Sequence, residues 1–241
     1  MATATTNRKN IMRNRKALFG LECQVTANKT NAYSTRSAIE ENRALILKNY
    51  TAAFMGNRQL ANQNTDDIFR NRKTILSSLD AQSDIEKNYV ESCLNEASID
   101  FMEHRADLNA SVLEVNQMMA EVNTKLIEIN SRIMKSNESI VSFNSKNLLI
   151  NSKILASGLS PKNATPATNA KRITRNKDRL SKILKVAKTN SATILGLLRI
   201  ASKNRSAIEK NANGILLRRK GIEDNRRKIV QNQSGVAKII C

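Results

Sequence analysis

Hydrophobic and polar positions recur along this chain with a period of seven residues. An aliphatic residue occupies one heptad position, here called a, and an asparagine follows three residues later at position d. The d positions run in steps of seven from 7 to 49, 57 to 78, 88 to 151 and 169 to 232. Asparagine fills 24 of these 31 positions, although the whole chain holds 30 asparagines in 241 residues. A heptad period sustained over this length predicts long helices that pair through a coiled-coil seam.

The widest interruption of the period predicts a helix boundary. The gap between the d positions at 151 and 169 holds Gly158, Pro161 and Pro166. Thr165 is placed to act as the N-cap of a helix whose first residue is Pro166, because proline is tolerated at the first helical position. The pattern therefore predicts a loop over 158–167.

Two smaller interruptions contain less turn-forming chemistry. Before Asn88 the spacing lengthens to ten residues, and Ser83 with Glu86 forms the pattern of a capping box that opens a new helix. A continuous, locally overwound helix through 79–84 is the alternative. Between Asn49 and Asn57 the spacing is eight, which predicts a skip or π-bulge inside one helix.

These signals predict an all-α protein of three very long heptad-repeat helices in an elongated coiled-coil bundle, up-down-up and spectrin-like or filament-type in packing. Seven glycines, two prolines and no tryptophan leave few turn-formers to fold the chain more compactly. The expected helices cover about 6–78, 84–157 and 166–237. As segments of one elongated domain, we expect a basic helix in 1–78, an acidic helix in 79–157, the loop in 158–167 and a strongly basic helix in 168–241.

Charge differs sharply between the three expected helices. Residues 1–78 carry 13 basic and 5 acidic side chains, residues 79–158 carry 7 and 12, and residues 159–241 carry 20 and 4. The resulting net charge of +19 favours an anionic partner. Complementary charge beside a heptad seam selects partners more than it stabilises them, since an exposed ion pair contributes only about 0–1 kcal/mol. We therefore expect the acidic middle helix to pack against basic neighbours.

The asparagines of the middle helix are the candidate residues for register and self-association. On a helical wheel their position lies within an apolar arc, so we expect their amides to be buried, where a partner at the same level must satisfy them. A core asparagine of this kind fixes register and oligomeric state. The alternative is a solvated stripe beside a narrower seam, above all in the third helix, whose apolar face is thin. The candidates are Asn109, Asn116, Asn123, Asn130, Asn137, Asn144 and Asn151.

This pairing of an aliphatic a residue with asparagine at d resembles the stalks of trimeric autotransporter adhesins, as in Ile127 with Asn130 and Val141 with Asn144. The resemblance covers the heptad pattern alone. The strongly basic charge and the three cysteines depart from that family, so we infer no membership of it.

Residue types that carry out catalysis are scarce. His104 is the only histidine, and the chain has no Walker loop, GxGxxG or CxxC motif. We therefore expect no enzymatic activity and no cofactor or metal. Three scattered cysteines, with no secretion signal or transmembrane stretch, predict a reducing and hence cytoplasmic compartment, or assembly on a cell structure.

Basic residues of the third helix are the candidates for contact with a polyanion or an acidic partner. They are Arg172, Arg175, Arg218, Arg219, Lys220, Arg226, Arg227 and Lys228. No sequence-specific nucleic-acid motif accompanies them, and this helix has no aromatic residue for base stacking. The sequence therefore favours a structural protein whose helices self-associate laterally into a homo-oligomer or polymer, such as a filament, sheath or scaffold. The alternative is a basic helical bundle that coats nucleic acid or another polyanionic surface.

Overall fold

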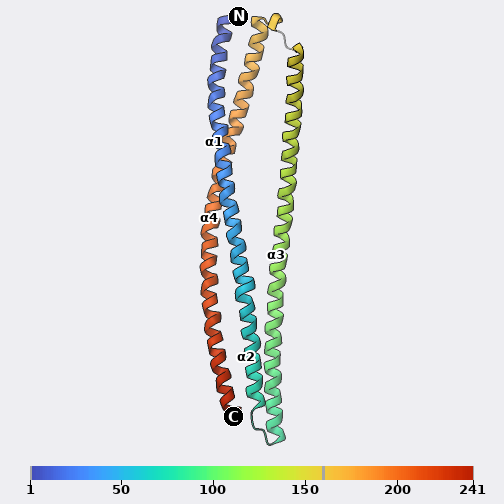
Figure 1. Cartoon of the computed structure of the whole chain (residues 1–241), viewed down its shortest axis with the longest axis vertical. Coiled ribbons are helices and arrows are strands. Elements are labelled where there is room, and N and C mark those ends of the chain that lie inside the picture. The colour runs from blue at the N-terminus through green and yellow to red at the C-terminus, as the bar shows by residue number, and fades with distance from the viewer. Residues whose placement is uncertain (1, 159–160, 241) are drawn as a thin grey trace. The chain divides into compact units, whose positions relative to one another are not determined.

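The protein is all-α, as the computed structural model in Figure 1 shows. The structure describes residues 2–158 and 161–240, and no β-strand occurs among them. The elements in chain order are α1 (Ala4–Thr51), η1 (Ala52–Arg58), α2 (Gln59–Ser77), α3 (Asp84–Lys153), η2 (Ile154–Gly158), η3 (Pro161–Asn163) and α4 (Pro166–Ile240). The prediction of an all-α protein with three long helical stretches is confirmed.

Local chemistry at the helix ends follows the sequence. Ser83 and Glu86 form both halves of a capping box, so the chain turns between α2 and α3 and does not continue as one overwound helix. The Thr165 hydroxyl accepts a hydrogen bond from the backbone N–H of Thr168, and α4 begins at Pro166. These two caps separate the three long helical stretches.

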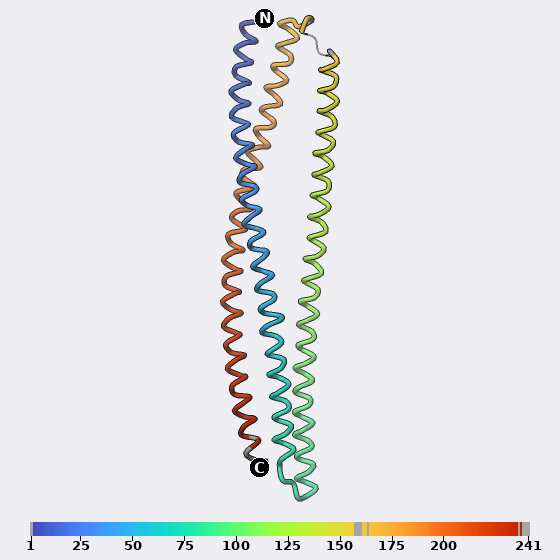
Figure 2. Tube along the Cα trace, viewed as in Figure 1, coloured from blue at the N-terminus to red at the C-terminus, as the bar shows by residue number. Residues whose placement is uncertain are grey.

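The eight-residue spacing between Asn49 and Asn57 is absorbed by a π-helix. η1 widens the helix over Ala52–Arg58, while the chain continues from α1 through η1 into α2 without a turn (Figure 2). A π-bulge accommodates one inserted residue, so the side chains that follow return to the face they would otherwise leave. The prediction of a skip or π-bulge inside one helix is confirmed.

The chain divides into two compact units, one made of residues 1–66 with 163–231 and the other of residues 67–162 with 232–241. In the first unit α1 and α4 lie side by side and run in the same direction (Figure 1). Its buried residues include Leu21 of α1 and Ala187, Ala201 and Ile208 of α4.

The second unit contains an antiparallel hairpin of α2 and α3. The Phe69 and Phe101 rings stack with their centroids 4.4 Å apart, and Arg72 donates to the Asp100 carboxylate at 2.9 Å. Ala97 is buried on the same side of α3 as Phe101, four residues earlier. This side does not include the a or d positions, so the hairpin uses a different face of α3 from the heptad stripe.

The capping box makes the start of α3 sensitive to acid. Hydrogen bonds from the backbone N–H groups of Ser83 and Gln82 hold the pKa of the Glu86 carboxyl below its ordinary value of 4.5. Because the folded pKa is lowered, the ionised cap stabilises the helix above about pH 4.5, and this contribution disappears as the pH falls through the folded pKa.

We predict that the Glu86 carboxyl titrates below 4.5 in an NMR-monitored pH series. In Glu86→Gln, the protection of amides in the first turn of α3, measured relative to exchange in the unfolded chain, should no longer fall at acidic pH, because glutamine keeps the hydrogen bonds without the charge. Glu91→Gln, in the next turn, should leave that dependence unchanged. A Glu86 pKa at or above 4.5 contradicts the prediction.

Candidate functional site

The d-position asparagines of the first helix form a ladder of hydrogen bonds to the backbone of α4. In each rung the side-chain amide nitrogen donates to the carbonyl oxygen of an a-position residue of α4 at 2.7–3.0 Å. The rungs are Asn7 to Pro166, Asn14 to Ile173, Asn28 to Ala187, Asn42 to Ala201, Asn49 to Ile208, Asn57 to Ile215 and Asn64 to Ile222. At 1.5 Å per residue, successive heptad levels are about 10.5 Å apart.

The ladder holds the two helices parallel and in one register. Donor and acceptor are 159 residues apart in the chain up to Asn49 and 158 apart from Asn57 onward. The change occurs across η1, so the π-helix removes the one surplus residue and returns Asn57 and Asn64 to the seam. Without it, every donor beyond Asn49 would rotate away from α4 by about 100°.

The acceptor in each rung is a carbonyl that also belongs to the α4 backbone. A carbonyl oxygen has two lone pairs, so it can accept the asparagine amide in addition to its own helical N–H. The asparagines of the ladder are buried or half-buried, with Asn7, Asn42 and Asn64 at 6–7% exposure. Each amide is therefore satisfied at an interface where an unpaired one would cost about 1–3 kcal/mol.

The shortest rungs end at small acceptor residues. The two shortest rungs, both 2.7 Å, end at Ala187 and Ala201, which are buried at 4% and 3% exposure. The rungs to larger residues such as Ile173 and Ile208 measure 2.9–3.0 Å. Alanine removes side-chain bulk beside the carbonyl, so the asparagine approaches more closely.

Two d positions of α1 lack asparagine and interrupt the ladder. Leu21 is buried and forms an apolar layer in the seam. Thr35 is also buried, and its hydroxyl has no hydrogen-bond partner, unlike Thr30 and Thr51, which donate to carbonyls one turn earlier in their own helix. The threonine side chain is shorter than that of asparagine, which accounts for the missing rung at this level.

The two helices contribute different faces to this seam. In α1 the d positions are buried or half-buried, and the a residues Ile11, Leu18, Val25, Ile39 and Ile46 remain 44–52% exposed. In α4 the reverse holds, since the a positions from Ile173 to Ile229 are buried or half-buried and all the d positions are exposed. The seam is therefore directional: α1 donates from d, and α4 accepts at a.

The expected burial of the middle-helix asparagines is wrong for the single chain. Asn109, Asn116, Asn123, Asn130, Asn137, Asn144 and Asn151 are all exposed. The hairpin buries the Ala97 and Phe101 side of α3 and leaves the a and d stripe in solvent. A solvated stripe, the alternative, describes α3 in the single chain. Whether these residues mediate self-association stays a prediction.

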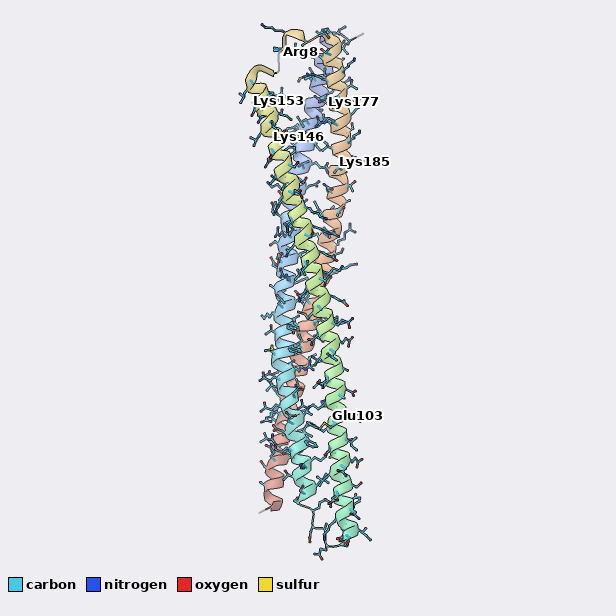
Figure 3. All side chains as sticks on the ribbon, turned by 90° about the vertical axis from the view of Figure 1, so that its right-hand side faces the viewer. Arg8, Glu103, Lys146, Lys153, Lys177 and Lys185 are labelled. Atoms are coloured by element: carbon cyan, nitrogen blue, oxygen red, sulfur yellow. The ribbon has the colours of Figure 1, made fainter. Side chains whose placement is uncertain are left out.

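The predicted basic residues lie along α4 without forming one cluster. Arg172, Arg175, Arg218, Lys220, Arg227 and Lys228 are exposed, and Arg219 and Arg226 are half-buried. Two of them form ion pairs within α4: Arg219 donates to Glu223 at 2.6 Å and Arg227 to Asp224. Other basic residues extend the set, including Lys177 and Lys185 on the first part of α4 (Figure 3).

Apolar grooves run along one side of the α1 and α4 pair. Ile11 and Leu18 of α1 and Asn176 and Ile183 of α4 line a groove of about 420 Å³. Farther along, a groove of about 530 Å³ combines Ile46 of α1 with residues of α4 that include Asn211 and Arg218. Both grooves join the exposed a positions of α1 to the exposed d positions of α4.

The heptad pattern alone did not identify the first helix as the donor of the ladder. All three helices carry the same stripe, and nothing in a single stripe shows which partner it meets. One regularity in the sequence relates the three helices to one another. Their first d positions, Asn7, Asn88 and Asn169, are 81 residues apart, and the third d position of each run is apolar (Leu21, Met102 and Ile183). These intervals mark the helices as three in-register copies of one unit.

No family model, curated protein or solved structure matches this chain. Among the described residues, no helix is long and apolar enough to cross a membrane. The same part of the chain holds no group of three or more histidine, cysteine, aspartate or glutamate side chains arranged to bind a metal ion.

We predict that Asn42→Ala lowers the free energy of unfolding by about 1–2 kcal/mol, because it removes a buried rung and part of the seam contact. Asn204→Ala is the matched control: it alters the sixth d position of α4 as Asn42 is the sixth of α1, but it is exposed. This control should change stability by no more than about 0.5 kcal/mol. Urea unfolding of dilute protein measures both, and equal losses would contradict the ladder.

We also predict that deleting Ala52 leaves the fold and its stability intact. The deletion restores seven-residue spacing between the d positions on either side of η1, so the helix can continue without a π-turn. Deleting Ala32, another exposed alanine of the same helix, should be strongly destabilising, because the donors between it and η1 then leave the seam. Circular dichroism during thermal unfolding compares the two, and equal melting temperatures would refute this role of η1.

Proposed function

We propose that this protein is a structural protein whose asparagine-laddered helices self-associate laterally into a filament, sheath or scaffold. The observation that carries the proposal is the parallel ladder between α1 and α4, together with the unused copies of the same stripe on α3 and α4. The kind of asparagine ladder that joins α1 to α4 within the chain can also form between helices of different chains.

The ladder suits assembly because it specifies register. Helices with the same heptad throughout can slide by whole heptads at small cost in apolar contact, and polar core positions limit such sliding. Each rung contributes roughly 0.5–1.5 kcal/mol net, so the seven rungs together stabilise the parallel pairing by several kcal/mol. The small residues Ala187 and Ala201 opposite Asn28 and Asn42 then favour one alignment over a slide of one heptad. A polymer whose subunits must repeat at fixed axial positions needs such a device.

The exposed apolar surface of α3 also supports association. Along its a positions the residues Ile85, Ile99, Leu113, Ile127, Met134, Val141 and Leu148 are 63–82% exposed. An apolar stripe of this length exceeds what a monomer ordinarily leaves in water, and such surfaces mark interaction sites. Covering it would contribute to association at about 25 cal/mol per Å² of apolar area, before the entropic costs of binding.

A basic helical bundle that coats nucleic acid or another polyanionic surface is the second candidate. Lys171, Arg175, Arg179 and Lys182 line one shallow hollow on α4, with Asp178 as the acidic member. Such a row would bind phosphates through counterion release, without reading sequence. This function explains the net charge but leaves the ladder and the α3 stripe without a role.

Salt and nuclease distinguish the two functions. We predict that the nuclease-treated protein self-associates and remains associated at moderate salt, because apolar contacts and amide hydrogen bonds are not screened as surface charges are. Analytical ultracentrifugation over a concentration series measures this. As a control, Arg219, Lys220, Arg226, Arg227 and Lys228, which do not line the two grooves described above, are changed together to Gln, which should remove nucleic-acid retention and leave assembly in place.

The opposite result would support the second candidate. A protein that stays monomeric at high concentration until nucleic acid is added, and whose binding falls steeply with salt, is a polyanion-coating protein.

A further inference from the structure

We infer that the groove between α1 and α4 receives α3 of a second copy of this chain, parallel to both helices and in register with them. The inference rests on the proposed self-association and names the surfaces that make it. The result is a three-stranded parallel coiled coil in which each helix donates from its d positions to the a-position carbonyls of the next.

The groove has one line of donors and one line of acceptors, both unused. The d asparagines of α4 are exposed, and those amides make no hydrogen bond in the described structure. The a positions of α1 are half-exposed, and the same grooves contain both lines, as Leu18 with Asn176 and Ile46 with Asn211 show. A third helix seated there would accept from α4 and donate to α1.

α1 packs on α4 through one face of its helix, and α4 presents the equivalent face of its own helix to the groove. That face comprises the d positions and the g positions, which follow d by three residues. In α4 it carries Ile183, Val186, Leu197 and Ile200 at 44–58% exposure. α1 packs this face against the a positions of α4. The equivalent face of α4 therefore fits the a positions of another helix of the same kind.

α3 has the required stripe and no other use for it in the described structure. Its a residues are largely exposed, and its d asparagines from Asn109 to Asn151 are exposed without hydrogen bonds from their amides. The hairpin sends α3 back antiparallel to α2, whereas the observed rungs join parallel helices. A second copy turned end for end supplies α3 in the parallel direction.

The size of the a residues matches when the three helices are set in register by their first d positions. In the sixth layer Ile39 of α1 would meet Ala120 of α3 beside the buried Ala201 of α4. In the fifth layer Ala32 of α1 would meet Leu113 of α3 and Ile194 of α4. These two layers therefore combine large and small residues, a mixture that favours close packing of a three-stranded core.

Charge also favours α3 as the third strand. α3 is the acidic helix, and both walls of the groove are basic. Beside the seams this register places Glu96 and Glu103 of α3 near Arg179 of α4, and Glu91 of α3 near Arg15 of α1. Both arginines line the groove. A basic third strand, such as α4 of another copy, would instead meet like charge on both sides.

Disulfide trapping between chains tests the inference. The background is free of cysteine (Cys23→Ser, Cys93→Ala, Cys241→Ser), and each chain then carries one new cysteine. Asn190→Cys or Asn204→Cys on α4 is mixed with size-tagged Ala106→Cys or Ala120→Cys on α3. All four positions are exposed, so each variant should fold, and circular dichroism verifies this.

The parallel register predicts that Asn190→Cys couples to Ala106→Cys and that Asn204→Cys couples to Ala120→Cys. These pairs should form at least about tenfold more interchain disulfide than the two swapped pairs, because a shift of two heptads moves the cysteines about 21 Å apart and a disulfide needs Cα atoms within about 7 Å. Each cysteine takes part in one expected pair and one swapped pair, so the swapped pair is the control for the expected one.

Other outcomes overturn the inference. Preference for the swapped pairs indicates an antiparallel third helix, and coupling of Ala106→Cys chains to one another indicates an α3 to α3 seam. Ultracentrifugation of the same mixtures separates these failures from failure of the proposed function: assembly without the expected disulfides rejects this interface alone, whereas a protein that remains monomeric rejects self-association as well.

Discussion

The hydrogen bond from an asparagine side chain to a main-chain carbonyl is the interaction on which the first unit depends. Its acceptor is present at every residue, so the accepting helix needs no particular side chain, and Pro166, Ile173 and Ala187 all serve. Specificity lies in the donors, which must return to the same side of their helix at every level. Seven-residue spacing and one π-helix meet that condition over the rungs from Asn7 to Asn64.

Register in this seam follows from what stands opposite each donor. Asn28 and Asn42 meet the small residues Ala187 and Ala201, while Leu21 lies level with Leu180 of α4 and Thr35 with Ile194. A slide of one heptad would place the longer amides beside branched or larger side chains and leave the alanines opposite Leu21 and Thr35. The alternation of layers therefore specifies an alignment that the heptad alone leaves free.

Elements set by local chemistry could be predicted from the sequence, and pairings set by competition between similar surfaces could not. The capping box at Ser83, the start of α4 at Pro166 and the π-helix before Asn57 each follow from a few neighbouring residues. The partner of each stripe does not. Charge predicted that the acidic helix would pack against a basic neighbour, and α3 does pack on α2 with an ion pair between Arg72 and Asp100, but charge did not predict a ladder that joins two basic helices. Exposed charges of about 0–1 kcal/mol per pair were outweighed by a seam of apolar residues and satisfied amides.

A directional ladder has a consequence for assembly that a symmetric seam lacks. Each helix has a row of donors at its d positions and a row of acceptors at its a positions, on different sides. In a parallel pair one helix uses its donors and the other its acceptors, so the acceptors of the first and the donors of the second remain unused. In α1 and α4 these unused lines border the same grooves, so a single further helix can satisfy both. In the proposed three-stranded coil a third strand closes the ring of donors and acceptors, and in the hairpin of the single chain α3 runs antiparallel to α2. Because the observed rungs join parallel helices, the proposed coil takes its third strand from another molecule.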